Sequence, residues 1–245
     1  MIEPLRFSYY TPPIVEFLNA EIIMKTILCY GDSNTWGFIP CAENYRSLST
    51  KRYPRDVRWP GRLQQLLGSQ FHVIEEGLNS RTTNLDYQVP PDRNGATYLP
   101  PCLYSHAPID LVILALGGND LKSYFGRTPA DVCNGMRALI DIIQNSQYGS
   151  EMQSAPDILL LSQPIPLPIA EEYVDEAGNH VFENLVARAQ ALVPLYQMLA
   201  RDKQCHFLDL SDDVKPSAFD GAHLDKSAHI ACADLVHQTV LTIFS

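Results

Sequence analysis

The 245-residue chain has little positive charge and none of the long apolar runs of membrane proteins. Lysine and arginine number 18 against 28 aspartate and glutamate residues, which gives a formal net charge of −10. Nucleic-acid backbones and anionic membrane surfaces bind clustered Lys and Arg, so this balance argues against either as the main partner. The longest apolar run, 111–116, is far shorter than the ~20 residues of a membrane helix. The sequence predicts a soluble protein that acts on a small or neutral molecule.

Paired cysteines are lacking as well. The six cysteines form no CxxC pair, and several lie inside apolar patterns. This usage is typical of reduced thiols and favours a cytoplasmic protein. With 46% hydrophobic residues, the chain can build a core without disulfides or metals. The cysteines are Cys29, Cys41, Cys102, Cys133, Cys205 and Cys232.

The first residues show no signal-peptide pattern and no secondary-structure period. They include Glu3, Glu16 and Glu21 and no continuous apolar stretch, so secretion by that route is not expected. We predict that residues 1–24 form an arm outside the core and that residues 25–245 form one domain. Two interpretations of the arm stay open, a natural start at Met24 and an oligomerisation arm that docks on the fold.

Short β-rich apolar runs alternate with helical patterns from Thr26 onward. Strands are expected at 26–30, 71–75, 111–116, 158–161 and 206–210. Helices are expected at 59–67, from Thr128 onward, at 183–201 with a kink at Pro194, and at 227–243. This alternation predicts a parallel sheet covered by helices on both faces. Ligands of such sheets bind beyond the carboxyl ends of the strands.

Three expected strand-end loops carry residues suited to acyl transfer. Ser33 follows the first strand in the string GDSNTWG, and Asn119 follows the third strand in GGND. Asp220 and His223 lie three residues apart before the last helix, a spacing that allows a hydrogen bond fixing the imidazole tautomer. Each string alone also fits a plain turn, but together they provide a nucleophile, a donor amide and an acid–base pair.

In this order the strings resemble the GDSL, or SGNH, hydrolase family, from roughly Lys25 to the C-terminus. The segments GDSNTWG, DVRWPGRL, VIEEGLNSRTTN, NGATYLPPCL, DLVILALGGND and SYFGRTP resemble its arylesterase and acyltransferase branch, which includes enzymes able to make peracids. The resemblance implies an α/β fold, a three-layer α/β/α sandwich with a five-stranded parallel flavodoxin-like sheet. It also implies a homo-oligomer.

The resemblance implies roles for single residues. Ser33 is similar to the family nucleophile, Asp220 and His223 to the other triad members, and Asn119 to the oxyanion-hole amide. We expect the backbone N–H of Ser33 to be a further oxyanion donor. In the second block Ser80 stands where the family usually has glycine, and we expect it to supply another backbone N–H. A glycine conformation with positive φ is costly for serine, so Gly77, three residues earlier, stays an alternative for shaping this donor.

Four aromatic residues flank the motif loops and are candidates to wall a substrate pocket, although such residues also serve as core. They are Trp36, Trp59, Tyr98 and Phe125. No long insertion suggests a large lid, which favours small esters over long-chain lipids. The resulting hypothesis is a serine esterase for short acetyl or aryl esters, working through an acyl-serine intermediate, with acyltransferase or perhydrolase side activity and no metal or cofactor.

Two alternatives stay open. A metal-dependent phosphoesterase could use the hard oxygen and imidazole ligands of Asp32, Asn119, Asp120, Asp220 and His223. A non-catalytic flavodoxin-like module could hold a phosphate or sugar on the Ser33 turn, but it would leave the Asp–His pair without a role.

Overall fold

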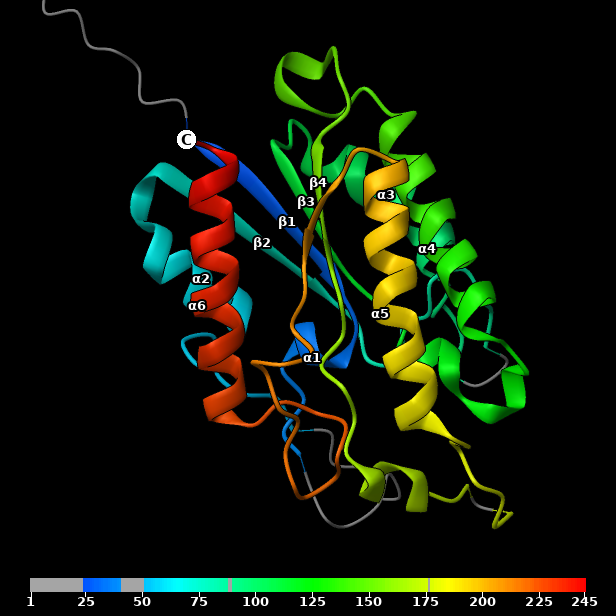
Figure 1. Cartoon of the computed structure of the whole chain (residues 1–245). Helices are drawn as coiled ribbons and strands as arrows, with labels where there is room; N and C mark the ends of the chain where they lie inside the picture. The colour runs from blue at the N-terminus through cyan, green and yellow to red at the C-terminus, as the bar shows by residue number, and fades with distance from the viewer. Residues whose placement is uncertain (1–23, 41–50, 88–89, 176) are drawn as a thin grey trace, which may run out of the picture.

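Five parallel strands form one sheet in the order β2-β1-β3-β4-β5 (Figure 1). The computed structural model describes residues 24–40, 51–87, 90–175 and 177–245. Adjacent strands are in register along their length, with Cys29 of β1 between Glu75 of β2 and Ile113 of β3. The strands are β1 (Lys25–Gly31), β2 (Phe71–Gly77), β3 (Leu111–Ala115), β4 (Asp157–Leu161) and β5 (His206–Leu208).

Helices cover both faces of the sheet (Figure 1). Helices α2 (Trp59–Leu67) and α6 (Lys226–Ile243) pack on one face, and α3 (Gly95–His106), α4 (Pro129–Gln144) and α5 (Leu185–Asp202) on the other. The predicted three-layer α/β/α sandwich with a five-stranded parallel sheet is therefore confirmed. The short elements are α1 (Ser33–Trp36) and the 3-10 turns η1 (Gly68–Gln70), η2 (Asn119–Leu121), η3 (Ser123–Phe125), η4 (Ser150–Met152) and η5 (Pro168–Glu172).

Burial and capping explain why these segments adopt these structures. Every residue of β3 is buried, because both faces of the sheet are covered, and the sequence there reads as a continuous apolar run. Helix α4 begins with a capping box in which the Thr128 side chain accepts from the Asp131 N–H and the Asp131 carboxylate accepts from the Thr128 N–H. At the start of α6, Asp225 accepts from the N–H of Ala228.

Helix α3 is the element that the sequence pattern did not predict. Pro100 and Pro101 lie inside it, and proline in a helix interior removes a backbone hydrogen bond. The helix nevertheless forms, because Asn94 caps its first turn and because Leu99 and Leu103 are fully buried against the sheet. Tertiary packing here outweighs the local cost of the prolines.

The expected arm at residues 1–24 falls almost wholly outside the described residues, so the domain boundary at residue 25 stays a prediction. Within the described residues, no helix is long and apolar enough to cross a membrane. The expected homo-oligomer and the cytoplasmic location likewise stay predictions.

Candidate active site

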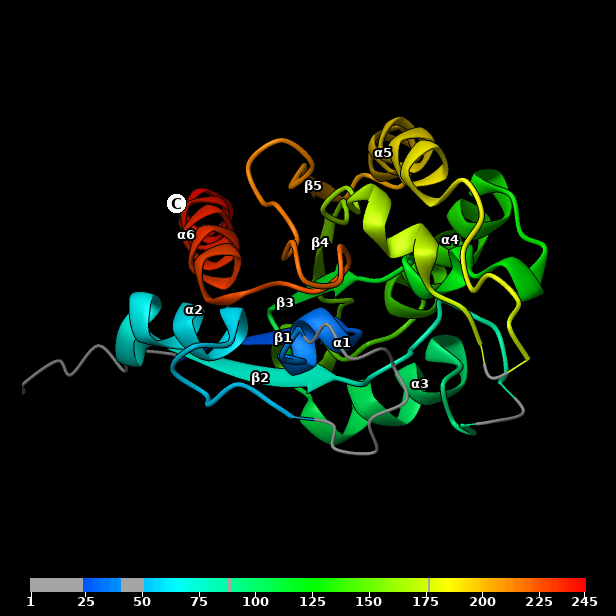
Figure 2. The ribbon, with the colours of Figure 1, turned by 90° about the horizontal axis from the view of Figure 1, so that it is seen from below.

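The carboxyl ends of the parallel strands place three loops beside one another. Figure 2 looks onto this end of the sheet, with α1 following β1 and the β5–α6 connection passing close to it. Because α1 begins at Ser33, directly after β1, the serine hydroxyl lies at the edge where parallel α/β sheets bind their ligands. Ser33 and His223 meet here although 190 residues separate them in the chain.

Ser33, His223 and Asp220 form a continuous hydrogen-bonded chain. The Ser33 Oγ lies 3.0 Å from His223 Nε2, and His223 Nδ1 lies 2.9 Å from Asp220 Oδ2. All three side chains are buried or nearly so. With Nδ1 protonated and hydrogen-bonded to the carboxylate, Nε2 is left as the acceptor for the serine hydroxyl proton.

The Asp220 carboxylate is held by its own loop as well as by the histidine ring. Its Oδ1 accepts from the backbone N–H groups of Ala222, at 3.0 Å, and of His223, at 2.9 Å. Burial by itself would raise the pKa of Asp220, but the hydrogen bonds and charge of His223 outweigh it and lower the pKa below its ordinary value. Asp220 is thus a stable anion beside the imidazole.

Asn34 is a site residue that the sequence reasoning did not single out. Its Oδ1 accepts from the N–H of Leu224 at 3.0 Å, and its Nδ2 donates to the Ala222 carbonyl at 3.3 Å. These two bonds grip the backbone on either side of His223 from the residue next to Ser33. The Phe38 ring also packs on the imidazole, with ring centroids 4.4 Å apart. Because Asn34 acts through a contact 190 residues away, no local pattern announces it.

Asn119 and Ser80 lie in the loops that follow β3 and β2. The Asn119 Nδ2 donates to the carbonyl of Arg81 at 3.2 Å, which fixes the amide orientation and uses one of its two N–H donors. Ser80 adopts a left-handed backbone conformation with φ of 65°, a region that favours glycine. A Cβ at Gly77 would lie 2.2 Å from the Trp36 backbone nitrogen, so the close approach of α1 requires glycine there.

A small cavity opens beside Ser33 and His223. Its volume is about 70 Å³, and its apolar wall comes mainly from α5 and the β4–α5 connection, with one residue from η2. That is about half of the ~150 Å³ cavity known to accommodate a benzene ring in another protein. The wall residues include Leu121, Pro166, Phe182, Leu185, Leu192 and Tyr196.

The four aromatic residues predicted to wall the pocket lie elsewhere than in this cavity lining. Trp59 is 2% exposed in the core between the sheet and α2, and its backbone N–H donates to Nδ1 of the buried His229. Trp36 stacks under Arg52, and Tyr98 is 42% exposed on α3. Phe125 packs against the rings of Tyr87 and Tyr124. None of the four lines the cavity next to Ser33, which α5 helps to form. Their role in substrate binding stays a prediction.

Buried charges surround the site without forming part of the hydrogen-bonded triad. Burial is the main cause that raises the pKa of Asp32 and of Asp120 to about 6 and lowers that of Lys122 to about 8. Asp32 accepts from the Asn34 N–H at 2.9 Å and caps α1. Asp32 therefore braces the turn that carries Ser33. The Lys122 Nζ donates to the Tyr87 hydroxyl at 2.8 Å.

One group of potential metal ligands converges in the part of the chain that the structure describes. Glu76, Cys102 and His106 have ligand atoms within 4.8 Å of one another. His106 and Glu76 are hydrogen-bonded at 2.9 Å, and burial raises the pKa of the Cys102 thiol to about 12, which disfavours the thiolate that metals bind. The ligand set of the phosphoesterase alternative does not converge in this way among the described residues.

Comparisons with known proteins identify the family. The sequence model of the GDSL-like Lipase/Acylhydrolase family matches residues 29–238. The chain therefore belongs to this SGNH family of carboxylic ester hydrolases. The comparison with curated proteins gave no match.

Solved structures of similar proteins support this assignment. An aryl esterase of M. smegmatis shares 37% identity with a TM-score of 0.81, covering 89% of this chain and 99% of that one. A carbohydrate acetylesterase of Sinorhizobium meliloti gives the same identity, TM-score and coverage. A lipase/acylhydrolase of Enterococcus faecalis, at 18% identity and a TM-score of 0.62, covers 89% of this chain and 95% of its own and shows the shared fold alone.

Proposed function

We propose that the protein is a serine esterase that cleaves short-chain acyl esters, acetyl and aryl esters among them, through an acyl group on Ser33. The observation that carries this proposal is the Asp220–His223–Ser33 chain, with contacts of 2.9 and 3.0 Å, at the mouth of a small apolar cavity. The names of the aryl esterase and the carbohydrate acetylesterase, each 37% identical, support the same substrate class.

The first half of the reaction forms the acyl-enzyme. His223 Nε2 takes the hydroxyl proton as Ser33 Oγ attacks the ester carbonyl carbon. Asp220 stabilises the imidazolium that results. The bond to the alcohol oxygen then breaks, His223 returns the proton to that oxygen, and the acyl group stays on Ser33.

The carbonyl oxygen becomes an anion in the tetrahedral intermediate, and three donors would hold it. We assign the backbone N–H groups of Ser33 and Ser80 and the second N–H of the Asn119 amide. Loss of one such donor costs ~10² to 10³ in rate in other hydrolases. In the second half-reaction His223 activates water, which attacks the acyl carbon and releases the acid and the free serine.

The cavity favours short acyl chains. A buried methylene gains ~0.8 kcal/mol of transfer free energy where there is room, whereas overpacking a filled site costs ~1 to 3 kcal/mol. In about 70 Å³ bounded by Leu185 and Leu192 the second effect wins after few carbons. Selectivity should fall beyond about four to six acyl carbons, an estimate from these opposing energies.

Alcohol or hydrogen peroxide should replace water in the second half-reaction. Either one carries an O–H whose proton His223 can accept, so attack on the acyl carbon gives a new ester or a peracid. The apolar wall of α5 would restrict water around the acyl group and so favour an added acceptor. This transferase and perhydrolase activity is the finer part of the proposal.

A chain-length series tests the proposal. kcat/KM is measured for p-nitrophenyl acetate, butyrate, octanoate and palmitate, and products are quantified with and without added peroxide. Acetate or butyrate should react best. A preference for palmitate would contradict the short-acyl assignment, and the absence of peracid would reduce the protein to a plain esterase.

Labelling with a fluorophosphonate probe tests the nucleophile. Ser33→Ala should abolish labelling. Ser162→Ala is the matched control, because Ser162 also lines the cavity but donates to Asp209 at 2.7 Å rather than to a histidine. Labelling that persists in Ser33→Ala would show that another residue is the nucleophile.

A further inference from the structure

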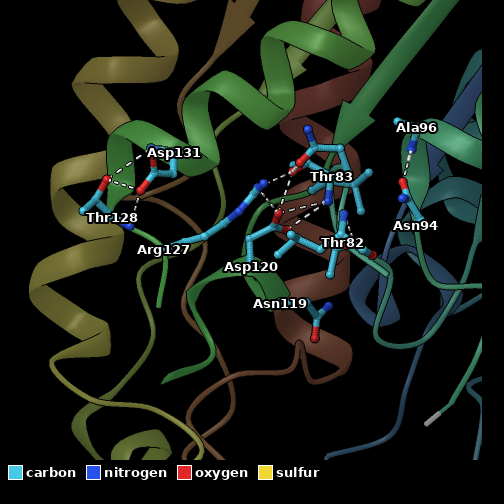
Figure 3. A network of polar contacts seen from close by, with 12 residues as sticks. Thr82, Thr83, Asn94, Ala96, Asn119, Asp120, Arg127, Thr128 and Asp131 are labelled. Atoms are coloured by element: carbon cyan, nitrogen blue, oxygen red, sulfur yellow. Dashed lines mark hydrogen bonds and ion pairs between the residues drawn. The ribbon is translucent and has the colours of Figure 1, made fainter. Parts of the chain in front are cut away.

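A buried carboxylate, that of Asp120 beside Asn119, binds Thr83 in the segment that follows β2 (Figure 3). Asp120 Oδ2 accepts from the backbone N–H of Thr83 at 3.0 Å, and Oδ1 accepts from the Thr83 hydroxyl at 2.5 Å. Asp120 follows Asn119 in the turn after β3, and Thr83 lies three residues beyond Ser80 in the segment after β2. One carboxylate thus joins both loops through short, buried contacts.

The contact is costly, which makes a bare packing role a poor explanation. Asp120 is fully buried, and its negative charge is balanced by Arg127, whose Nη1 lies 3.1 Å from Oδ1. Removing a charge from water costs free energy unless hydrogen bonds and a partner compensate for it. Hydrogen bonds to an ionised acceptor are about twice as strong as neutral ones, so the charge strengthens the junction between the loops.

The two loops need such a junction, because neither donor lies in an α-helix or a β-strand. Ser80 has a left-handed backbone that a non-glycine residue adopts at a cost, so surrounding contacts have to maintain it. Asn119 has one direct bond to the neighbouring loop, from Nδ2 to the Arg81 carbonyl at 3.2 Å. In enzymes, a displacement of about 1 Å can cost ~10²-fold in rate.

We propose that the Asp120–Thr83 contact fixes the spacing between the Ser80 N–H and the Asn119 amide, so that both residues of the contact are positioning residues for the oxyanion. This inference rests on the proposed function, because it presumes that an oxyanion forms on an acyl-Ser33 pathway. Neither Asp120 nor Thr83 touches substrate. Their effect is on the transition state through the donors.

A pair of substitutions at position 83 isolates the hydroxyl. Thr83→Val keeps the shape and the backbone N–H but removes the hydroxyl that binds Asp120, whereas Thr83→Ser keeps both donors. We expect Thr83→Val to lower kcat about 10- to 100-fold with KM within about twofold. Thr83→Ser should stay within about threefold of the wild-type kcat, because the bond to Asp120 is retained.

Asp131→Asn is the matched control for stability. Asp131 is a carboxylate at the start of α4 that binds Thr128 at 2.7 Å in the capping box, and it lies in the same field of view (Figure 3). Its loss should lower the unfolding midpoint without changing kcat. If Thr83→Val behaves like Asp131→Asn, with a lower unfolding midpoint and an unchanged kcat, the positioning role is wrong.

A transition-state analogue reads out the oxyanion donors directly. When Ser33 Oγ adds to the carbonyl carbon of a short trifluoromethyl ketone, the serine proton passes to His223. The ketone oxygen becomes an anion that the oxyanion donors bind. The affinity for the ketone should fall in Thr83→Val by the same factor as kcat/KM, whereas inhibition by the product alcohol should not change. Equal losses for both inhibitors would mean that the whole site has shifted and would overturn the proposal.

The Ser33→Ala variant, run in the same assays, separates the two proposals. If Ser33→Ala is inactive and Thr83→Val has wild-type kcat and ketone affinity, the positioning inference fails and the esterase proposal stands. If Ser33→Ala retains activity, the proposed function fails.

Discussion

Protonation of His229 should be a measurable cost to folding. The ring is fully buried beneath α2, and its Nδ1 accepts from the backbone N–H of Trp59 at 3.3 Å. If Nδ1 were protonated, its N–H would face the backbone N–H of Trp59, and neither group could accept a hydrogen bond from the other. Burial is the main cause that lowers the pKa of His229 to about 4, and the nearby Asp225 carboxylate only partly opposes it.

The sign and size follow from the difference between the folded and unfolded pKa. The unfolded histidine has a pKa near 6.5 and so binds a proton that the folded protein refuses. The contribution of neutral His229 to the free energy of unfolding is complete above pH 6.5 and is lost as the pH falls towards 4. From pH 7.5 to 5 the loss is about 2 kcal/mol.

Two buried carboxylates act in the opposite direction. Asp32 and Asp120 have a pKa raised to about 6, so the folded protein binds their protons more tightly than the unfolded chain. Their stabilisation is present at low pH and is lost as the pH rises through 6. Between pH 7.5 and 5, each carboxylate adds about 1 kcal/mol to the free energy of unfolding. These gains offset the loss from His229, so the pH profile of the wild-type protein alone does not reveal the histidine.

The assay is therefore a comparison with His229→Asn, whose Oδ1 can still accept from the Trp59 N–H. Urea unfolding followed by tryptophan fluorescence gives the free energy of unfolding at pH 7.5 and pH 5. The variant leaves a cavity and should be less stable at pH 7.5, but the gap should narrow by about 2 kcal/mol at pH 5. Parallel pH profiles for the two proteins would refute a neutral buried His229.

Three further substitutions have defined outcomes. Ser33→Ala and His223→Ala should each remove nearly all turnover of p-nitrophenyl acetate, and the double variant should be little worse, because triad members act as a unit; additive losses would contradict the shared step. Ser80→Gly should raise the free energy of unfolding by about 1 kcal/mol with kcat retained, because glycine adopts the left-handed conformation at no steric cost. A fall in kcat would mean that the serine side chain contributes to catalysis. Leu192→Ala should shift the kcat/KM ratio of butyrate to acetate about tenfold towards butyrate, at ~0.8 kcal/mol per accommodated methylene; an unchanged ratio would place the acyl group elsewhere.

The sequence was informative wherever local pattern and strand topology agree. Five apolar runs predicted five strands, and the observed strands differ from the predicted ranges by at most two residues at either end. Helix α2 has the predicted bounds, Trp59–Leu67, because a proline at its start and a glycine after its end mark it locally. Helix α3 was missed, because its two prolines give the local signal of a loop.

Part of the candidate site could also be predicted from the sequence, and part could not. Ser33, Asn119 and His223 could be placed at one edge from the sequence, because the carboxyl ends of parallel strands meet there whatever their order in the chain. The order β2-β1-β3-β4-β5 then sets which loops are neighbours, and no periodicity encodes it.

The surroundings of the Ser33 hydroxyl were decided only by the tertiary structure. The cavity wall comes from α5, whose Leu185 and Leu192 read in the sequence as ordinary core residues. Asn34 holds the His223 loop, and Asp120 binds Thr83, through contacts between segments 190 and 37 residues apart. Local propensity extends over a turn or two of chain, whereas pocket shape and donor spacing arise from side chains that meet only after the sheet has formed.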